Sequence, residues 1–322
     1  MFLEVVRING FKSFAQETSI DFKPGIGVII GSNGVGKSNI LDAIAWSLGE
    51  TDLASLRCQK YLDLFFSGSD GCPEAGEIRV ELIISAAGDR DARPLKMARE
   101  ADRRGKESFF EDGKAVDARH YREALAERGL GNAVRTIIRQ EGINGLIHMN
   151  SGERVNYLSL LLGSRVTGSL ADSINNDFRL FLKELLPGGD GAVRLDNTGG
   201  APVLEVEAAF PGKAMRNAVL LSGGEKTICS LALSLAFFER LGSPLYLFDE
   251  VEPSLDWTNH HHMQSLFRKL SQKRQLLMIT HLRSTIELAD TLHGVRARGD
   301  GTSYVKFYFE MNERLLRAYK CC

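Results

Sequence analysis

A glycine-rich segment near the N-terminus carries the residue types that bind phosphate groups. Residues 31–38 read G-S-N-G-V-G-K-S and match the pattern G-x-x-x-x-G-K-[ST] at every fixed position. Glycines let successive backbone N–H groups turn toward phosphate oxygens, and a helix that begins at Lys37 would add its positive N-terminal end. We expect Lys37 to reach the β- and γ-phosphates of a nucleotide and the Ser38 hydroxyl to bind Mg²⁺. The expected phosphate-binding residues are Ser32, Asn33, Gly34, Val35, Gly36, Lys37, Ser38 and Asn39.

A second candidate site is an apolar segment that ends in two adjacent carboxylates. Residues 245–248 read L-Y-L-F, and Asp249 and Glu250 follow them. Adjacent residues of a strand point to opposite faces, so only one of these carboxylates can face a metal ion. We assign Asp249 to Mg²⁺ and Glu250 to the general base that polarises an attacking water. Two solvated acids at a strand end are the alternative interpretation.

The elements that must position these residues are predicted from hydrophobic periodicity. The apolar run at residues 27–30 predicts a strand before the glycine-rich loop, and the spacing at 37–48 predicts a helix after it. In the second half, strands alternate with helices, which indicates a mostly parallel sheet covered on both faces, and a small antiparallel lobe flanks the first half. Further strands are expected at 2–8, 18–22, 78–85, 95–99, 108–110, 203–209, 245–248, 276–279 and 304–309, and helices at 121–128, 153–162, 170–186, 225–241 and 258–270.

Composition and charge exclude several classes of protein. The 322 residues are 43% hydrophobic and 25% charged, which is typical of globular proteins and not of disordered, collagen-like or disulfide-scaffold chains. The net charge is -1, so contact with nucleic acid would need a local basic patch. No apolar run approaches the roughly 18 residues of a membrane span. The five cysteines lack C-x-x-C spacing, and we expect a reduced, cytoplasmic protein that makes no membrane contact.

The segment between the two candidate sites resembles the signature of a known superfamily. Residues 221–226 read L-S-G-G-E-K, and L-S-G-G-E/Q is the signature motif of ABC-type ATPases. Ser222 would cap a new helix, and Gly223 and Gly224 would leave its first N–H groups open to an anion. A plain helix cap is an acceptable local alternative, but it does not explain the glycine-rich loop, the signature and the carboxylate pair in the ABC order.

The resemblance to ABC-type ATPases implies further site residues. Gln140 resembles the Q-loop glutamine that binds Mg²⁺, and Asp256 lies in S-L-D, which resembles the D-loop. His281 ends L-M-I-T-H and resembles the switch histidine. The resemblance implies ATP and Mg²⁺ as cofactors and ATP hydrolysis as the activity, with Glu250, Gln140, His281 and Arg57 as catalytic residues.

Within this superfamily, the chain resembles the head of an SMC (structural maintenance of chromosomes) protein. The segments that carry the resemblance are 8–14 (I-N-G-F-K-S-F), 37–44 (K-S-N-I-L-D-A-I), 56–57, 64–69, 140–143 and 292–295. They imply an ABC-type ATPase head with a mostly parallel P-loop sheet, flanking helices and an antiparallel β lobe, built from N- and C-terminal halves. Glu252 stands where the family has Asp, and the catalytic pair before it is kept.

A complete SMC protein inserts coiled-coil arms and a hinge between the two halves of its head, and the chain has no heptads in the corresponding region. We therefore expect an N-terminal half at residues 1–163, a short linker at 164–169 in place of the coiled coil and hinge, and a C-terminal half at 170–322. The small residues of the linker indicate deletion of the arms by engineering. A naturally armless relative is the alternative.

The SMC resemblance also implies partners. Two heads would form an ATP-dependent homodimer, head to tail, with each nucleotide between one P-loop and the partner's signature serine. Arg57 is expected to contact the phosphates, with an ordinary surface arginine as the alternative. Lys12 and Lys60 are expected to contact phosphates of double-stranded DNA without sequence preference. A kleisin-type subunit is a further implied partner.

Two other functions are compatible with the sequence. A DNA-repair ABC ATPase of the RecN or zinc-hook type would share these motifs, although the chain has no Cys-x-x-Cys hook. An ABC transporter motor would usually place an aromatic residue ahead of the P-loop to stack on adenine, and the segment 21–27 offers only Phe22.

Overall fold

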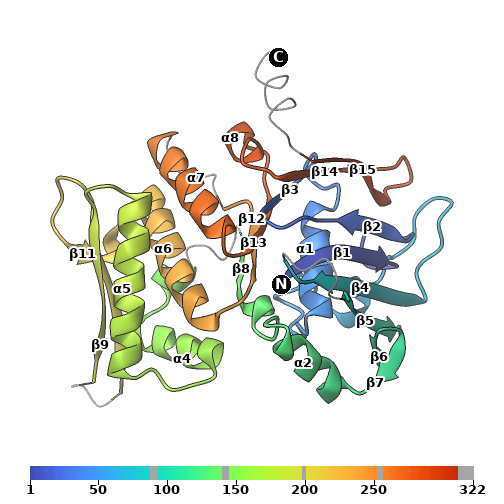
Figure 1. Cartoon of the computed structure of the whole chain (residues 1–322), viewed down its shortest axis with the longest axis horizontal. Helices are drawn as coiled ribbons and strands as arrows, with labels where there is room; N and C mark the ends of the chain where they lie inside the picture. The colour runs from blue at the N-terminus through green and yellow to red at the C-terminus, as the bar shows by residue number, and fades with distance from the viewer. Residues whose placement is uncertain (88–92, 140–144, 198–200, 252–256, 311–322) are drawn as a thin grey trace. The chain divides into compact units, whose positions relative to one another are not determined.

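The computed structural model describes residues 1–87, 93–139, 145–197, 201–251 and 257–310 (Figure 1). The chain divides into two compact units. The first comprises Met1–Ile137, Ser243–Asp249 and the chain from Ser271 onward, and the second comprises Ile138–Gly242 and Glu250–Leu270. Within the described ranges, no helix has both the length and the apolar character needed to cross a membrane.

The first unit contains five strands of the sheet that carries the glycine-rich loop, and the sixth strand, β8, begins at Ile137, where the chain passes into the second unit. The strand order is β15-β14-β3-β13-β12-β8, in which β14, β3, β13 and β12 run parallel and β15 is antiparallel to β14. The strands β12 and β13 are buried at every position, as continuous apolar runs in a covered parallel sheet should be. The bounds are β3 Ile26–Ile30, β8 Ile137–Arg139, β12 Leu245–Asp249, β13 Gln275–Ile279, β14 Thr291–Ala297 and β15 Ser303–Glu310.

A second, antiparallel sheet completes the first unit. Its order is β2-β1-β4-β5-β6-β7, and the helix α1 (Lys37–Ser47) packs against β1, β4 and β5 of this sheet and against β12 of the other (Figure 1). Because α1 is covered from both sides, nine of its eleven residues are buried. The bounds are β1 Phe2–Asn9, β2 Thr18–Asp21, β4 Glu77–Ser85, β5 Leu95–Asp102, β6 Glu107–Glu111 and β7 Lys114–Val116, with the helices α2 Ala118–Glu127, α8 Arg283–Ile286, η1 Tyr61–Leu64 and η2 Ala133–Arg135.

The second unit packs helices on a small antiparallel sheet of order β11-β10-β9. The helix α5 packs against α6 and β9, and α4 packs against β10. Gly191 of β9 allows the close approach of α5, because a Cβ there would lie 2.5 Å from the Phe178 ring. The bounds are α3 Gly145–His148, α4 Ser151–Leu162, α5 Gly168–Leu185, β9 Asp190–Asp196, β10 Val203–Ala209, β11 Arg216–Asn217, η4 Ala218–Leu220, α6 Gly223–Leu241 and α7 Trp257–Ser271.

The predicted strands and helices are present within a few residues of their expected bounds, and the α/β fold with its antiparallel lobe is confirmed. One sheet assignment was wrong: the strand at 203–209 does not join the parallel sheet but pairs antiparallel with β9 and β11. Its alternating burial is that of a strand covered on one face. The strands β9 and β14 and the short strands β7, β8 and β11 were not predicted. The helix α5 begins at Gly168, inside the expected linker, and the division into halves at 164–169 stays a prediction.

Candidate nucleotide site

The candidate residues of the first unit lie at one edge of the parallel sheet. The strand β12 ends at Asp249, which is in register with Ile279 at the end of β13, and Ile279 is in register with Ile29 of β3. The glycine-rich loop therefore leaves the sheet at the same edge as Asp249. His281, which is exposed, follows β13 after one intervening residue. Ligands of open α/β sheets bind at this carboxyl edge.

Two glycines of the loop have left-handed backbones for different structural reasons. Gly34 (φ 81°) is exposed, and a Cβ there would meet no atom within 4 Å. Gly36 (φ 93°) caps α1 and is packed tightly, because a Cβ there would lie 2.4 Å from the Ser303 hydroxyl and 2.5 Å from the Ser13 hydroxyl. Gly34 thus allows the left-handed backbone of an exposed turn, and Gly36 also allows the loop to pack closely against Ser13 and Ser303.

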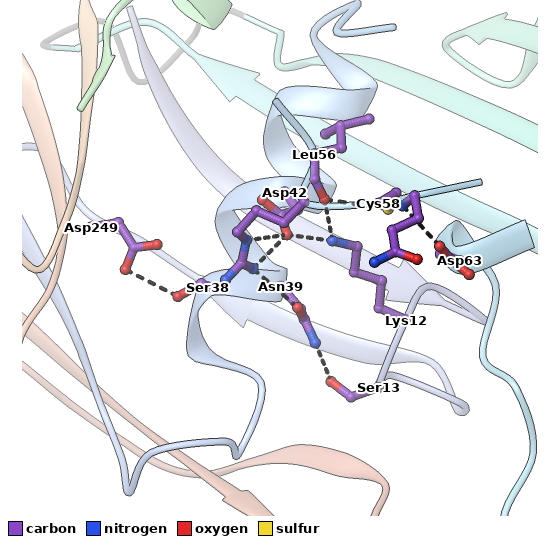
Figure 2. Close-up of polar contacts among 11 residues, drawn as sticks. Lys12, Ser13, Ser38, Asn39, Asp42, Leu56, Cys58, Asp63 and Asp249 are labelled. Atoms are coloured by element: carbon purple, nitrogen blue, oxygen red, sulfur yellow. Dashed lines mark hydrogen bonds and ion pairs between the residues drawn. The ribbon is translucent and has the colours of Figure 1, made fainter. Parts of the chain in front are cut away.

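The side chains of the loop and of α1 present the groups expected of a phosphate and metal site. The Lys37 ammonium donates to the backbone carbonyls of Gly31 (3.0 Å) and Ser32 (3.1 Å), and the residue is 6% exposed. The Ser38 hydroxyl donates to Oδ1 of Asp249 at 3.0 Å (Figure 2). A hydroxyl and a carboxylate oxygen are hard ligands of the kind that Mg²⁺ prefers. No side chain caps the N-terminus of α1, which suits an anion.

The second carboxylate is positioned differently from the sequence argument. The strand β12 ends at Asp249, and Glu250 adopts a left-handed backbone (φ 48°), so the alternation of a strand does not determine where Glu250 points. A left-handed conformation is costly for a residue with a Cβ, and such residues cluster at functional sites. Gln140 and Asp256, the expected Q-loop and D-loop residues, lie outside the described residues.

The signature residues lie in the second unit. Ser222 is the N-cap of α6, and its N–H donates to the Glu225 carboxylate at 2.9 Å. The Lys213 ammonium, 2.8 Å from the same carboxylate, and the Ser222 N–H hold the pKa of Glu225 below its usual value. Ser222 and Gly223 are exposed, and a Cβ on Gly223 would meet no atom within 4 Å. Ser222 and Glu225 form a capping box at the N-terminus of this 19-residue helix, and the exposed Ser222 and Gly223 leave room for an anion beside it.

Two basic residues that were expected to serve different ligands contact the same carboxylate. The Lys12 ammonium lies 2.6 Å from Oδ2 of Asp42, and the Arg57 guanidinium lies 2.5 Å from that oxygen through Nη2 (Figure 2 shows Lys12 and Asp42). The Lys12 side chain is 10% exposed, whereas Lys60 is exposed. The expected roles of Arg57, Lys12 and Lys60 stay predictions.

Sequence reasoning missed the polar residues that form hydrogen bonds with the glycine-rich loop and the start of α1. The Ser13 hydroxyl accepts a hydrogen bond from Nδ2 of Asn39 at 2.7 Å and lies 2.7 Å from the Ser303 hydroxyl. The Ser303 hydroxyl donates to the Val35 carbonyl at 2.8 Å. Isolated serines give no signal in a sequence. The position of Asp42 does give a signal in the sequence. It follows Ser38 by four residues on a predicted helix and is therefore one turn further along the same face.

Comparisons with known proteins place this site in a family. Residues 2–304 match the family described as RecF/RecN/SMC N terminal domain. The chromosome partition protein Smc of Mycolicibacterium paratuberculosis is 42% identical over 134 residues, which are 41% of this chain and 11% of that protein. The chain thus spans about a tenth of the length of the curated relatives it matches.

Two solved structures are similar to nearly the whole chain. One, described as the SmcHead bound to the C-winged helix domain of ScpA, superposes with a TM-score of 0.85 at 28% identity and covers 97% of this chain and 99% of its own. The SMC head domain from Thermotoga maritima superposes with a TM-score of 0.70 at 30% identity and covers 97% and 100%. With the family match over residues 2–304, these similarities show that the chain belongs to the RecF/RecN/SMC N-terminal domain family and has the ABC-type fold of an SMC head.

Proposed function

We propose that the chain is the ATP-binding and ATP-hydrolysing head of an SMC protein that acts in chromosome condensation and segregation. The observation that carries the proposal is the hydrogen bond between Ser38 and Asp249 beside a glycine-rich loop at the carboxyl edge of a parallel sheet. These two oxygen ligands come from distant parts of the sequence and meet where the nucleotide phosphates would lie. A plain glycine-rich turn gives no reason for this pairing.

The residues of the first unit have distinct roles in binding. The loop N–H groups and the Lys37 ammonium would hold the β- and γ-phosphates, since Lys37 already faces the loop through the Gly31 and Ser32 carbonyls. The Ser38 hydroxyl and the Asp249 carboxylate would hold Mg²⁺, with Gln140 as a further oxygen ligand. Bound Mg²⁺ would neutralise phosphate charge as the γ-phosphate is released.

Hydrolysis requires an activated water beside the phosphates. Glu250 would accept a proton from this water. Its left-handed backbone directly follows β12, so its side chain begins at the edge of the sheet. His281, which follows the neighbouring strand β13, would contact the γ-phosphate. Arg57 would contribute positive charge to the phosphates.

The proposed active form is a head-to-tail homodimer. The exposed Ser222 and Gly223, followed by Gly224, lie at the N-terminus of α6 beside the capping box of Ser222 and Glu225. In this arrangement the three residues would bind the γ-phosphate held by the partner's P-loop, with Asp256 at the same interface. Loss of the γ-phosphate would remove these hydrogen bonds, so hydrolysis would open the dimer.

Partners of the assembled protein are proposed from its relatives. Because a similar SMC head is described as bound to the C-winged helix domain of ScpA, we assign a kleisin-type subunit as a partner. Lys60, which is exposed, and Lys12 are the proposed contacts to the phosphates of double-stranded DNA. The assembly would act in the cytoplasm at the nucleoid.

The dimer provides the direct test of this function. In a Glu250→Gln chain, ATP with Mg²⁺ is expected to convert monomers into dimers, because binding is kept while the general base is lost. Adding Ser222→Arg should abolish the dimer, because a bulky cation would occupy the place of the γ-phosphate. Sedimentation velocity reports the mass, and nucleotide affinity of the monomer should be kept.

The matched control is Ser164→Arg, which makes the same substitution at an exposed serine outside the signature. This control should dimerise as the Glu250→Gln parent does. A dimer that survives Ser222→Arg, or a parent that stays monomeric with saturating ATP, would contradict the proposed interface.

A further inference from the structure

A single carboxylate oxygen in the first unit accepts hydrogen bonds from two cationic side chains. Oδ2 of Asp42 lies 2.6 Å from Nζ of Lys12, 2.5 Å from Nη2 of Arg57 and 3.2 Å from Nε of Arg57. Figure 2 shows Lys12 directed toward Asp42 and Leu56. Asp42 is completely buried, and the exposed fractions of the Lys12 and Arg57 side chains are 10% and 34%.

The backbones that present these cations are held in uncommon conformations. Lys12 (φ 49°) and Arg57 (φ 55°) are two of four left-handed residues other than glycine among the described residues. Such conformations persist where the surroundings fix them. The Lys12 ammonium also donates to the carbonyl of Leu56, the residue before Arg57. Lys12 therefore contacts the backbone beside Arg57 as well as the carboxylate that both cations share.

This cluster is attached to the first turns of the P-loop helix. Asp42 follows Ser38 by one helical turn. Nη2 of Arg57 also donates to Oδ1 of Asn39 at 3.2 Å, and Asn39 directly follows the Ser38 that contacts Asp249. The guanidinium therefore lies along the part of α1 that is closest to the candidate phosphate site.

The two cations compete for the negative charge of one oxygen. A buried carboxylate must be compensated by positive charge, so removal of one of these two cations leaves more of the negative charge to the other. Attraction to a buried carboxylate is screened less by water than attraction between two exposed charges. Loss of the Lys12 charge should therefore strengthen the contact between Asp42 and Arg57, and loss of the Asp42 charge should release Arg57.

Lys12 is also accessible from outside the cluster. It lines a cavity of about 520 Å³, together with Ser13, Lys60, Asp63, Arg103 and Asp300. Lys12 thus has one side toward this cavity, although its carboxylate partner is buried.

We propose that Asp42 is a positioning residue of the nucleotide site, which holds Arg57 against the start of α1, and that Lys12 sets how tightly Arg57 is held. The nucleotide role of Arg57 rests on the proposed function. The ion-pair competition itself does not, so the two are tested in separate measurements.

The first measurement uses the nucleotide-free chain. With ¹⁵N-labelled arginine, the Nε–H resonance of Arg57, assigned by its loss in Arg57→Lys, reports hydrogen exchange with water. Lys12→Met should slow this exchange by about threefold or more, and Asp42→Asn should accelerate it. Lys114→Met, at an exposed lysine of β7, is the charge-matched control and should leave it unchanged. Unchanged exchange in both Lys12→Met and Asp42→Asn would overturn the proposal.

The second measurement uses binding of ATP with Mg²⁺ by the monomer, which separates a positioning role from a merely structural one. Asp42→Asn should weaken binding by about tenfold when Arg57 is present and by much less in an Arg57→Ala background, because coupled residues are not additive. Asp42→Glu, which keeps the charge, should restore part of the affinity. Most of the coupling should persist from about 0.05 to about 0.5 M KCl, because partly buried ion pairs are screened much less by salt than exposed ones.

The outcomes separate the two proposals. Equal losses in the two backgrounds, or a coupling that disappears in salt, would refute positioning of Arg57 by Asp42. If Asp42→Asn fails to fold, Lys12→Met in the presence and absence of Arg57 provides the same cycle, and additivity there refutes the proposal. A wild-type chain that binds no ATP but shows the expected exchange pattern would refute the proposed function and leave the ion-pair competition in place.

Discussion

The hydroxyl of Ser38 donates a 3.0 Å hydrogen bond to Oδ1 of Asp249, although 211 residues separate them in the sequence. Ser38 lies in the first turn of α1, and Asp249 is the last residue of β12, which pairs with β13, the neighbour of β3. The parallel sheet thus brings together two hard oxygen ligands at its carboxyl edge. Their contact gives a first prediction about metal dependence.

Ser38→Ala should remove most of the effect of Mg²⁺ on nucleotide binding. A hydrogen bond or ligand contact to a charged group contributes about 1.5–3 kcal/mol, so the affinity gained from Mg²⁺ should fall by roughly tenfold or more. Calorimetric titration of ATP with Mg²⁺ and with EDTA measures this gain. Ser38→Thr keeps the hydroxyl and should behave as the wild type; an equal loss in both variants would assign the effect to packing and not to the oxygen.

Lys37→Ile should abolish nucleotide binding, whereas Glu250→Gln should keep binding and stop turnover. The Lys37 ammonium donates to the loop carbonyls and in the proposed function would bind phosphate in the ground state, whereas Glu250 would act on water. Equilibrium binding of a fluorescent ATP analogue and steady-state phosphate release separate the two effects. Hydrolysis at the wild-type rate by Glu250→Gln would remove that residue from the role of general base.

Gly36→Ala should destabilise the fold more than Gly34→Ala. Both positions have left-handed backbones, where an added Cβ costs about 1–2 kcal/mol. At Gly36 the new methyl group would also lie 2.4 Å from the Ser303 hydroxyl and 2.5 Å from the Ser13 hydroxyl, whereas at Gly34 it would meet no atom within 4 Å. Urea unfolding without nucleotide measures the difference. Equal losses would mean that the hydroxyls move away at little cost.

Stability should fall as the pH falls from 6.5 toward 4 because of a buried histidine. Burial lowers the pKa of His293 from 6.5 to about 4, and its ring lies between Phe22 and Tyr308. Between these values the unfolded chain binds the extra proton, so protonation favours unfolding by up to roughly 3 kcal/mol. Urea unfolding at several pH values should show this slope, and His293→Phe should flatten it.

The control for this slope is the exposed His120. Its hydrogen bond to Glu111 raises its pKa, so its small stabilisation is present at low pH and is lost as the pH rises through its folded pKa. His120→Gln should therefore leave the acid-side loss of stability in place. A flat profile in the wild type would contradict the buried, neutral state of His293.

The sequence by itself determined the local elements of the candidate site. A glycine-rich loop followed by a lysine and a helix N-terminus within eight residues predicts a phosphate-binding loop, so G-S-N-G-V-G-K-S gives this prediction without knowledge of the rest of the chain. Continuous apolar runs likewise predicted the buried parallel strands β12 and β13, because burial on both faces leaves no polar alternation.

Only the tertiary structure decided which distant groups share a surface. The strand β10 was predicted correctly but assigned to the wrong sheet, because local periodicity does not specify a pairing partner. The close packing of Gly36 depends on Ser13 and Ser303, which lie 290 residues apart in the sequence. The contacts of Lys12 and Arg57 with Asp42 depend on two loops that meet at α1. Such contacts arise when helices, strands and loops pack against one another. Residue spacing along the chain does not indicate which distant groups come within the few ångströms that a hydrogen bond requires.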